Sequence, residues 1–127
     1  MKHIALDTNV AIAILNGKRD VFDKITDVSA IYLPITVCGE LLFGAKNAAK
    51  SRENMPIYQA FIATCLPLNI NKVVAEEYAN IRHELKIKGR PIPENDIWIA
   101  ATCIAYNICL YTLDKHFIDI TKLKTIS

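Results

Sequence analysis

The stretch His3-Ile4-Ala5-Leu6-Asp7 joins a short apolar run to a carboxylate. A run of this length, bounded by polar residues, predicts a short buried β-strand. The stretch Cys109-Leu110-Tyr111-Thr112-Leu113-Asp114 shows the same order near the other end of the chain. Each of these predicted strands is therefore followed by an aspartate, Asp7 in one case and Asp114 in the other.

Between these two stretches, short β-like runs alternate with segments of helical periodicity. The predicted strands cover residues 3–6, 30–33, 66–68, 109–112 and 124–126. The predicted helices cover residues 10–17, 20–26, 36–49, 51–65, 71–89 and 94–107. Ser51 and Asn71 are expected to cap two helices at their N-termini, and Gly17 and Gly89 to close two at their C-termini.

This alternation predicts an α/β fold with a short parallel sheet flanked by helices on both faces. A chain of 127 residues without internal repeat or linker is expected to form one domain, residues 1–127. In sheets of this class, ligands bind outside the carboxyl ends of the strands. Asp7 and Asp114 are therefore expected at the same edge of the sheet.

The composition excludes several classes of protein. Hydrophobic residues make up 52% of the chain, yet no apolar run approaches the roughly 20 residues of a membrane span. No secretory signal is visible, so the cytoplasm is the expected compartment. The four cysteines form no C-x-x-C pair, which predicts buried thiols rather than a zinc site. The net charge is only +2, and the basic residues between positions 82 and 90 fit a solvated helix face, with a partial role in steering phosphate left open.

Two further acids complete a set of four. Glu40 lies at the margin of the apolar stripe of predicted helix 36–49, and Asp96 lies in the first turn of predicted helix 94–107. If the fold brings these acids to Asp7 and Asp114, the four like charges cannot all stay ionised without a cation. Hard oxygen ligands suit Mg²⁺ or Mn²⁺. An acidic site of this kind points to chemistry on phosphate esters.

Each acid also has a plain structural role. Asp7 can cap the first helix, as can Thr8 beside it. Asp96 gains roughly 0.3–1 kcal/mol from the helix dipole, and Asp114 can serve as a turn residue. Glu40 is as consistent with a surface charge as with a ligand. Only the positions of all four together, at strand ends or on helices that can face them, indicate a site.

Four blocks of the sequence, which contain these four acids, resemble the PIN-domain family and, within it, the VapC-type ribonuclease toxins of toxin–antitoxin pairs. The resemblance covers nearly the whole chain, and its third and fourth blocks are specific when taken together. The matching blocks are Leu6-Asp7-Thr8-Asn9, Glu40 early in a helix, Asn95-Asp96-Ile97-Trp98-Ile99-Ala100-Ala101, and Thr112-Leu113-Asp114 followed by Phe117.

The resemblance implies a Rossmann-like sheet and a Mg²⁺-dependent endoribonuclease, with Mn²⁺ as the alternative ion. The site it implies is lined by Asp7, Glu40, Asp96 and Asp114, which would hold the metal and carry the catalysis. Asn9 and Thr112 match family positions that support the site by hydrogen bonding. The family also implies an RNA substrate, a homodimer, and a cognate antitoxin whose tail covers the active site.

The predicted reaction is hydrolysis of an RNA phosphodiester by water. The metal is expected mainly on Asp7 and Asp96, with Glu40 and Asp114 binding it directly or through water. Because water is the nucleophile, no serine, histidine or cysteine nucleophile is required. His116 lies near Asp114 and is expected to be a surface histidine, with a contact to RNA as the alternative.

Three other functions are weighed against this one. A haloacid-dehalogenase-type phosphatase needs a second aspartate two residues after Asp7, where Asn9 stands. A phosphoacceptor receiver domain needs an adjacent acidic pair near the first strand, and Asp7 has no acidic neighbour. A non-catalytic RNA- or protein-binding module of the same PIN fold is the main alternative. The four intact acids argue against it.

Overall fold

The computed structural model describes residues 2–127. Within these residues the strands form one sheet of order β3-β2-β1-β4-β5, and all neighbouring strands are parallel. The strands are β1 (Lys2–Leu6), β2 (Val28–Pro34), β3 (Leu66–Leu68), β4 (Cys109–Tyr111) and β5 (Thr125–Ile126). The helices are α1 (Thr8–Leu15), α2 (Arg19–Asp23), α3 (Ile35–Asn47), α4 (Ser51–Ala63), α5 (Lys72–Lys88), α6 (Glu94–Ala105) and the 3₁₀ helix η1 (Lys115–Asp119). The predicted α/β fold with a short parallel sheet is confirmed.

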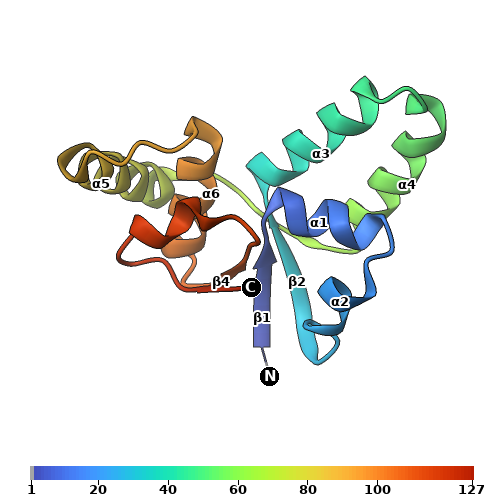
Figure 1. The fold of residues 1–127 in the computed structure, drawn as a ribbon, viewed down its shortest axis with the longest axis horizontal. Helices are drawn as coiled ribbons and strands as arrows, with labels where there is room; N and C mark the ends of the chain where they lie inside the picture. Colours follow the sequence, from blue (N-terminus) through green and yellow to red (C-terminus); the bar gives the residue numbers. More distant parts are fainter. Residues whose placement is uncertain (1) are drawn as a thin grey trace.

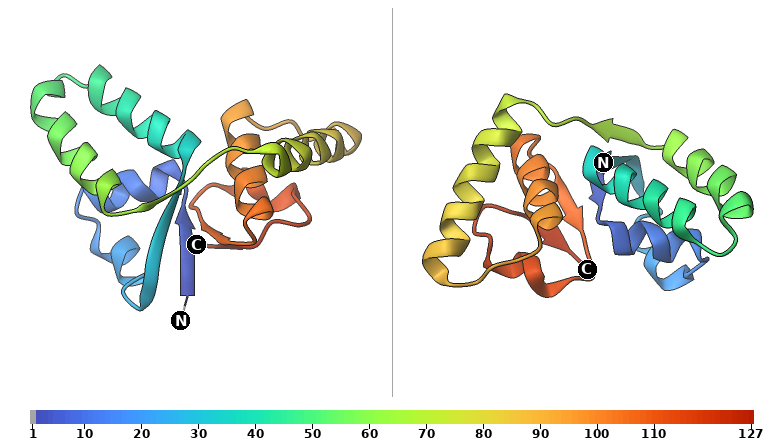
Figure 2. Two further views of the ribbon diagram at one scale, coloured as in Figure 1. Left: turned by 180° about the vertical axis from the view of Figure 1, so that it is seen from behind. Right: turned by 90° about the horizontal axis from the view of Figure 1, so that it is seen from above.

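The strand order reverses at β1. From β1 the chain winds outward through β2 to β3 and then crosses to β4 and β5 on the other side. Figure 1 shows α1 to α4 on one side of the central strands and α5, α6 and η1 on the other, and the two views of Figure 2 agree. The carboxyl ends of β1 and β4 therefore flank the topological switch point, where sheets of this class bind ligands.

Helix α6 runs through the core, and its start carries one of the four acids. Ile97 and every residue from Ile99 to Cys103 are buried, so the helix is fixed against the sheet along most of its length. Asp96 precedes this buried segment and is held in place by it. Helix α4, in contrast, buries none of its residues and forms an arm with α3.

Two of the predicted helix ends are confirmed and one is wrong. The side chain of Asn71 caps α5 by accepting a hydrogen bond from the Val74 backbone N–H at 3.0 Å. Gly89 closes the same helix at φ +65°, a left-handed conformation that glycine adopts without strain. Ser51 does not cap α4, because Lys50 occupies the cap position and Ser51 is already the first helical residue.

Other boundaries differ from the predicted ones by a few residues. The second helix is shorter than predicted, ending at Asp23, and the chain then turns into β2. Gly17 lies in the turn after α1 at φ +76°, with Asn16 as the cap residue. The helix η1 was not predicted, because a 3₁₀ helix of five residues is too short to show a periodic pattern. None of the described helices is long and apolar enough to cross a membrane.

Candidate active site

Asp7 is fixed at the junction of β1 and β4. Its backbone N–H donates to the Tyr111 carbonyl at 2.9 Å, which continues the pairing of the two strands. One carboxylate oxygen accepts from the Thr8 backbone N–H at 2.8 Å and so caps α1. The other accepts from the Thr112 hydroxyl at 2.7 Å. The residue is only 3% exposed, so both interactions are shielded from water.

Thr112 connects Asp7 to Asp114. While its hydroxyl donates to Asp7, its oxygen accepts from the Asp114 backbone N–H at 3.0 Å. The Asp114 side chain in turn accepts from the His116 backbone N–H at 3.1 Å and begins helix η1. The capping and turn roles foreseen for Asp7 and Asp114 are thus both present, and they leave both carboxylates facing the same space.

Glu40 is held from two sides. One carboxylate oxygen accepts from the Thr8 hydroxyl at 2.5 Å, and the other accepts from the Asn95 side-chain amide at 3.3 Å. Thr8 belongs to α1 and Asn95 to α6, so this carboxylate joins three helices. Both partners are neighbours in sequence of another acid, Asp7 or Asp96.

The structure brings all four predicted acids to one pocket of about 460 Å³. The pocket lies at the carboxyl edge of the sheet, as expected for this fold. Its lining consists of Asp7, Thr8, Asn9, Glu40, Pro93, Glu94, Asn95, Asp96, Asp114 and His116. Sequence reasoning did not predict Thr8, Glu94 or Asn95 as site residues, although Thr8 and Asn95 lie within the blocks that resemble the family.

Burial and mutual repulsion act on these acids. Burial raises the pKa of the Asp7 carboxyl, the bonds from Thr112 and Thr8 oppose the rise, and Asp96 and Asp114 add to it. The pKa of Asp96 is also raised, first by burial and then by Asp114 and Glu40, while contact with His116 lowers it. A nearby cation would relieve the cost of ionising both carboxyls.

His116 lies closer to the site than its sequence context indicated. Its ring Nδ1 is 3.2 Å from an oxygen of Asp96 and 3.2 Å from an oxygen of Asp114. The side chain is 47% exposed, so the predicted surface position is confirmed, but the prediction did not include the contacts with the two acids. A signal was available, since a histidine two residues after an acid that opens a turn can fold back over that acid.

Asn9 and Thr112, the two predicted supporting residues, differ in what they contact. Thr112 bonds Asp7 directly and is 4% exposed. Asn9 lines the pocket and is exposed, and among the described residues no hydrogen bond involves its side chain. Asn9 therefore faces the space that a ligand would occupy rather than the protein.

The donor set fits a divalent cation. Ligand atoms of Asp96, Asp114 and His116 all lie within 4.8 Å of one another, which is compact enough for one ion. Asp7 lines the same pocket but lies outside this compact group, and both of its oxygens are already hydrogen-bonded. Asp96 and Asp114 thus lie close together in this structure, and the pair of Asp7 and Asp96 as the main metal ligands stays a prediction.

The cysteines offer no reactive thiol. Cys38, Cys65 and Cys103 are buried, Cys109 is half-buried, and all four are free. Burial raises the pKa of each of these thiols above its usual value, which disfavours the nucleophilic thiolate. The prediction of buried thiols is confirmed for Cys38, Cys65 and Cys103, whereas Cys109 is only half-buried.

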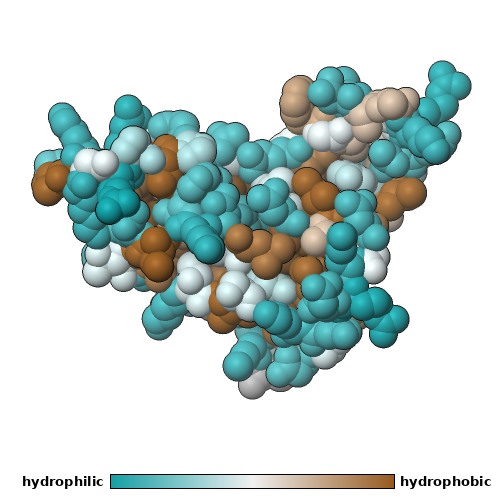
Figure 3. All heavy atoms as spheres, in the orientation of Figure 1, coloured by the Kyte–Doolittle hydropathy of each residue, from teal (hydrophilic) through white to brown (hydrophobic). Residues whose placement is uncertain are grey.

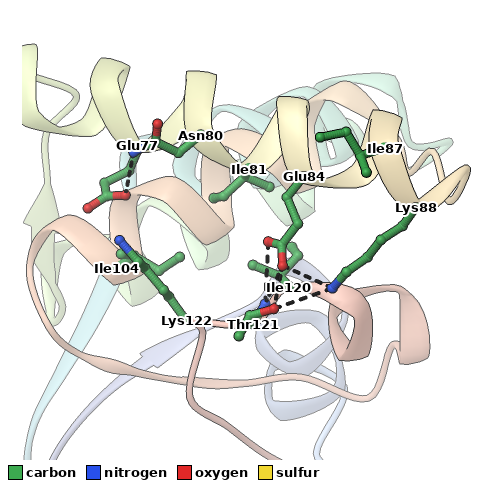
Figure 4. Close-up of a pocket in the computed structure, with 10 residues that line it drawn as sticks. All are labelled: Glu77, Asn80, Ile81, Glu84, Ile87, Lys88, Ile104, Ile120, Thr121 and Lys122. Atoms are coloured by element: carbon green, nitrogen blue, oxygen red, sulfur yellow. Dashed lines mark hydrogen bonds and ion pairs between the residues drawn. The ribbon is translucent and has the colours of Figure 1, made fainter.

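A second cavity, of about 470 Å³, lies between α5 and the segment that follows η1 (Figure 4). Its walls are largely isoleucine side chains, including Ile81, Ile104 and Ile120. The polar groups at its mouth already pair with each other, since Lys88 contacts Glu84 at 2.9 Å and Glu84 also bonds Thr121. This cavity lacks the converging acids and is separate from the acidic pocket.

The parallel sheet with its acidic pocket at the switch point defines a single-sheet α/β protein with four carboxylates at the carboxyl edge of its sheet. Residues 4–123 match the PIN domain family, and the chain belongs to that family.

The chain is also similar to proteins named as VapC ribonucleases and to a solved VapBC structure. The chain is 27% identical to Ribonuclease VapC2 of Rickettsia felis over 111 residues, covering 84% of this chain and 83% of that protein. It is 26% identical to Ribonuclease VapC1 of Haemophilus influenzae strain R2866 over 124 residues, covering 94% and 92% of the two chains. The crystal structure of VapBC2 from Rickettsia felis bound to a promoter DNA fragment superposes with a TM-score of 0.89 at 25% identity, covering 98% and 97%.

Proposed function

We propose that this protein is a metal-dependent endoribonuclease that hydrolyses RNA phosphodiester bonds, and that it is the toxin of a VapBC-type toxin–antitoxin pair. The observation that carries the proposal is the convergence of Asp7, Glu40, Asp96 and Asp114 on one pocket. The ribonuclease names of the relatives support the substrate class.

Mg²⁺ is the expected ion, with Mn²⁺ as the alternative, and Asp96 and Asp114 are the residues best placed to hold it. When bound, a divalent cation would polarise a phosphoryl oxygen of the RNA and would make a bound water lose its proton more easily. Asp7 keeps the pocket negative from a fixed position, because both of its oxygens are held by hydrogen bonds. Glu40, steadied by Thr8 and Asn95, faces the same space from α3.

The remaining chemistry is that of hydrolysis. Water attacks phosphorus, and the bond between phosphorus and the leaving ribose oxygen breaks. The pocket offers carboxylates, two amides and an imidazole but no serine or cysteine, which agrees with water as the nucleophile. The carboxylates also repel the phosphate backbone unless a cation lies between them, so binding of RNA and of the ion should be linked.

The test is cleavage of RNA by the purified protein. Cleavage is expected with Mg²⁺ or Mn²⁺ and should stop with EDTA. Asp96→Asn and Asp7→Ala should be folded and inactive, whereas Asp27→Asn, at an exposed position outside the pocket, should cleave normally. Persistence of cleavage in EDTA and in both site variants would indicate a contaminating nuclease and refute the proposed site.

The main alternative is a non-catalytic PIN-fold module that binds RNA or protein. Such a module has no need for several buried or half-buried carboxylates with raised pKa values, as found for Asp7 and Asp96. It would bind RNA without cutting it, so the same assay separates the two functions. The expected location in the cytoplasm stays a prediction.

An antitoxin partner is proposed from the surface of α3. Phe43 is 67% exposed, and Leu42 and Ile35 on the same helix are also exposed. Figure 3 shows hydrophobic side chains at the surface over the α3–α4 arm. A shallow pocket beside Phe43 shares Thr8, Glu40 and Asn95 with the acidic pocket, so the two are contiguous.

This continuity supports inhibition by a basic residue of the partner. A segment packed on Phe43 could place an arginine against Glu40 and its neighbours, where the guanidinium matches carboxylates through parallel hydrogen bonds. Replacing that arginine with alanine should preserve the complex and restore ribonuclease activity. Unchanged inhibition would mean that the antitoxin acts by covering the pocket.

A further inference from the structure

The ring nitrogen of His116 occupies the space between two acids that come from different elements. Nδ1 is 3.2 Å from an oxygen of Asp96, on α6, and 3.2 Å from an oxygen of Asp114, after β4. One donor atom from each of the three residues falls within a 4.8 Å group. Two oxygens and one imidazole nitrogen in the acidic pocket therefore lie close enough together to bind one ion.

Neighbouring contacts hold His116 in this position. Its backbone N–H donates to Asp114, which opens η1 and fixes the direction of the chain. The next residue, Phe117, is 2% exposed and anchors the helix in the core. The backbone at His116 is thus restrained on both sides along the chain, while the side chain is 47% exposed.

We propose that Nδ1 of His116 is a ligand of the divalent cation, together with Asp96 and Asp114, and that it makes the site select Mn²⁺ over Mg²⁺. This inference rests on the proposed metal-dependent function and replaces Mg²⁺, the ion expected there, with the alternative ion Mn²⁺. Mg²⁺ favours an octahedral shell of oxygens and retains several waters. Carboxylates suit both Mg²⁺ and Mn²⁺, whereas an imidazole nitrogen is a softer donor that binds transition-metal ions in preference to Mg²⁺, so the nitrogen shifts the selectivity of an otherwise carboxylate site toward Mn²⁺.

The other role open to His116 is that of a counter-ion that pairs with the two carboxylates and must leave when a metal enters. The two roles predict opposite results on removing the ring. Loss of a ligand weakens binding of Mn²⁺, whereas loss of a competing cation strengthens binding of both Mn²⁺ and Mg²⁺. Exposed ion pairs contribute little to stability, so either variant should fold.

The experiment measures Mn²⁺ and Mg²⁺ affinity by calorimetry on the metal-free protein. The variants are His116→Asn, which offers an oxygen in place of Nδ1, and His116→Ala. The control His83→Asn makes the same change at an exposed position on α5 outside the pocket. In both His116 variants the Mn²⁺ affinity should fall by about 10–100-fold or more. A loss of that size is typical when a residue that only supports a metal ligand is removed, and the loss of a ligand should cost at least as much. Mg²⁺ affinity should change much less, and the control should match the wild type.

Spin-echo spectroscopy of bound Mn²⁺ gives a readout independent of affinity and activity. Nitrogen coupling from a coordinated imidazole is expected in the wild type and in His83→Asn, and should be absent in His116→Ala. Unchanged or tighter Mn²⁺ binding in the His116 variants, or no nitrogen coupling in the wild type, would overturn the proposal. Failure of the wild type to bind Mn²⁺ would overturn it as well.

The two proposals can fail separately. If Asp96→Asn abolishes Mn²⁺ binding and RNA cleavage while His116→Asn changes neither, the ribonuclease stands and the histidine ligand falls. If Mn²⁺ binding depends on His116 but the protein cuts no RNA, the ligand stands and the ribonuclease falls.

Discussion

The hydroxyl of Thr112 donates to a carboxylate oxygen of Asp7 at 2.7 Å, and both residues are almost completely buried. The bond ties the end of β1 to the residue after β4, across the switch point of the sheet. It also links two acids, because the same hydroxyl oxygen accepts from the Asp114 backbone N–H. One threonine therefore sets the relative position of two of the four carboxylates.

Thr112→Val keeps the shape and removes this hydroxyl. Asp7 loses a donor and the Asp114 N–H loses an acceptor, so the free energy of unfolding should fall by roughly 1–3 kcal/mol in urea titrations. Thr102→Val is the matched control, since Thr102 is also buried but donates to the carbonyl of Trp98 within its own helix. The free energy of unfolding should fall less in Thr102→Val than in Thr112→Val, because the Trp98 carbonyl keeps its helical hydrogen bond. Equal losses would show that the Thr112 hydroxyl has no special role.

Asp7→Asn should change how stability depends on pH in the presence of EDTA. Because the pKa of Asp7 is raised in the folded protein, its contribution is fully present below the unfolded value of about 3.9 and is lost as the pH rises through the folded value. The asparagine variant does not titrate, so its stability relative to the wild type should increase from acidic to neutral pH.

The measurement is a set of urea titrations at several pH values, starting below the usual aspartate pKa of about 3.9 and ending at neutral pH. Asp27→Asn, at an exposed position in the turn before β2, reports the effect of the same change outside the pocket. A wild-type protein that gains stability on the variant as the pH rises would contradict the raised pKa.

Thr8→Val tests whether Glu40 must be held in place. The change removes the hydroxyl that bonds Glu40 and leaves the helix cap intact, because the cap is the Asp7 carboxylate. Loss of a partner that orients a site carboxylate typically costs about 10–100-fold in activity or metal affinity. The turnover number with RNA should fall by that order, and Thr8→Ser should restore it. Full activity in the valine variant would exclude a positioning role for Thr8.

The protein should be a dimer at micromolar concentration by light scattering. The arm formed by α3 and α4 leaves Ile57 55% exposed, and α4 buries no residue of its own, so a second copy can cover this surface. Ile57→Lys should shift the protein toward the monomer. Ile118→Lys, on the opposite side at an 84% exposed position, should leave the dimer intact. A wild-type monomer, or a dimer broken only by Ile118→Lys, would place the interface elsewhere.

Local sequence patterns were enough to predict the order and type of the strands and α-helices. Short apolar runs and helical periodicity are local patterns, and they sufficed for the parallel α/β fold and for the caps at Asn71 and Gly89. The four acids were also found in the sequence, because each follows a strand or lies on a helix that can face that edge. Periodicity could not detect the short helix η1, and a favourable cap residue at Ser51 was overruled by an earlier start to the helix.

Which of the acids lie close together depends on the tertiary structure. The distances that group Asp96 with Asp114 and His116, and that leave Asp7 held by Thr112, join residues far apart in the chain. Such contacts depend on how α6 packs against the sheet and on where η1 turns. Local pattern therefore gives the residue types of the site, whereas the packing of α6 and η1 decides which of them can share one ion.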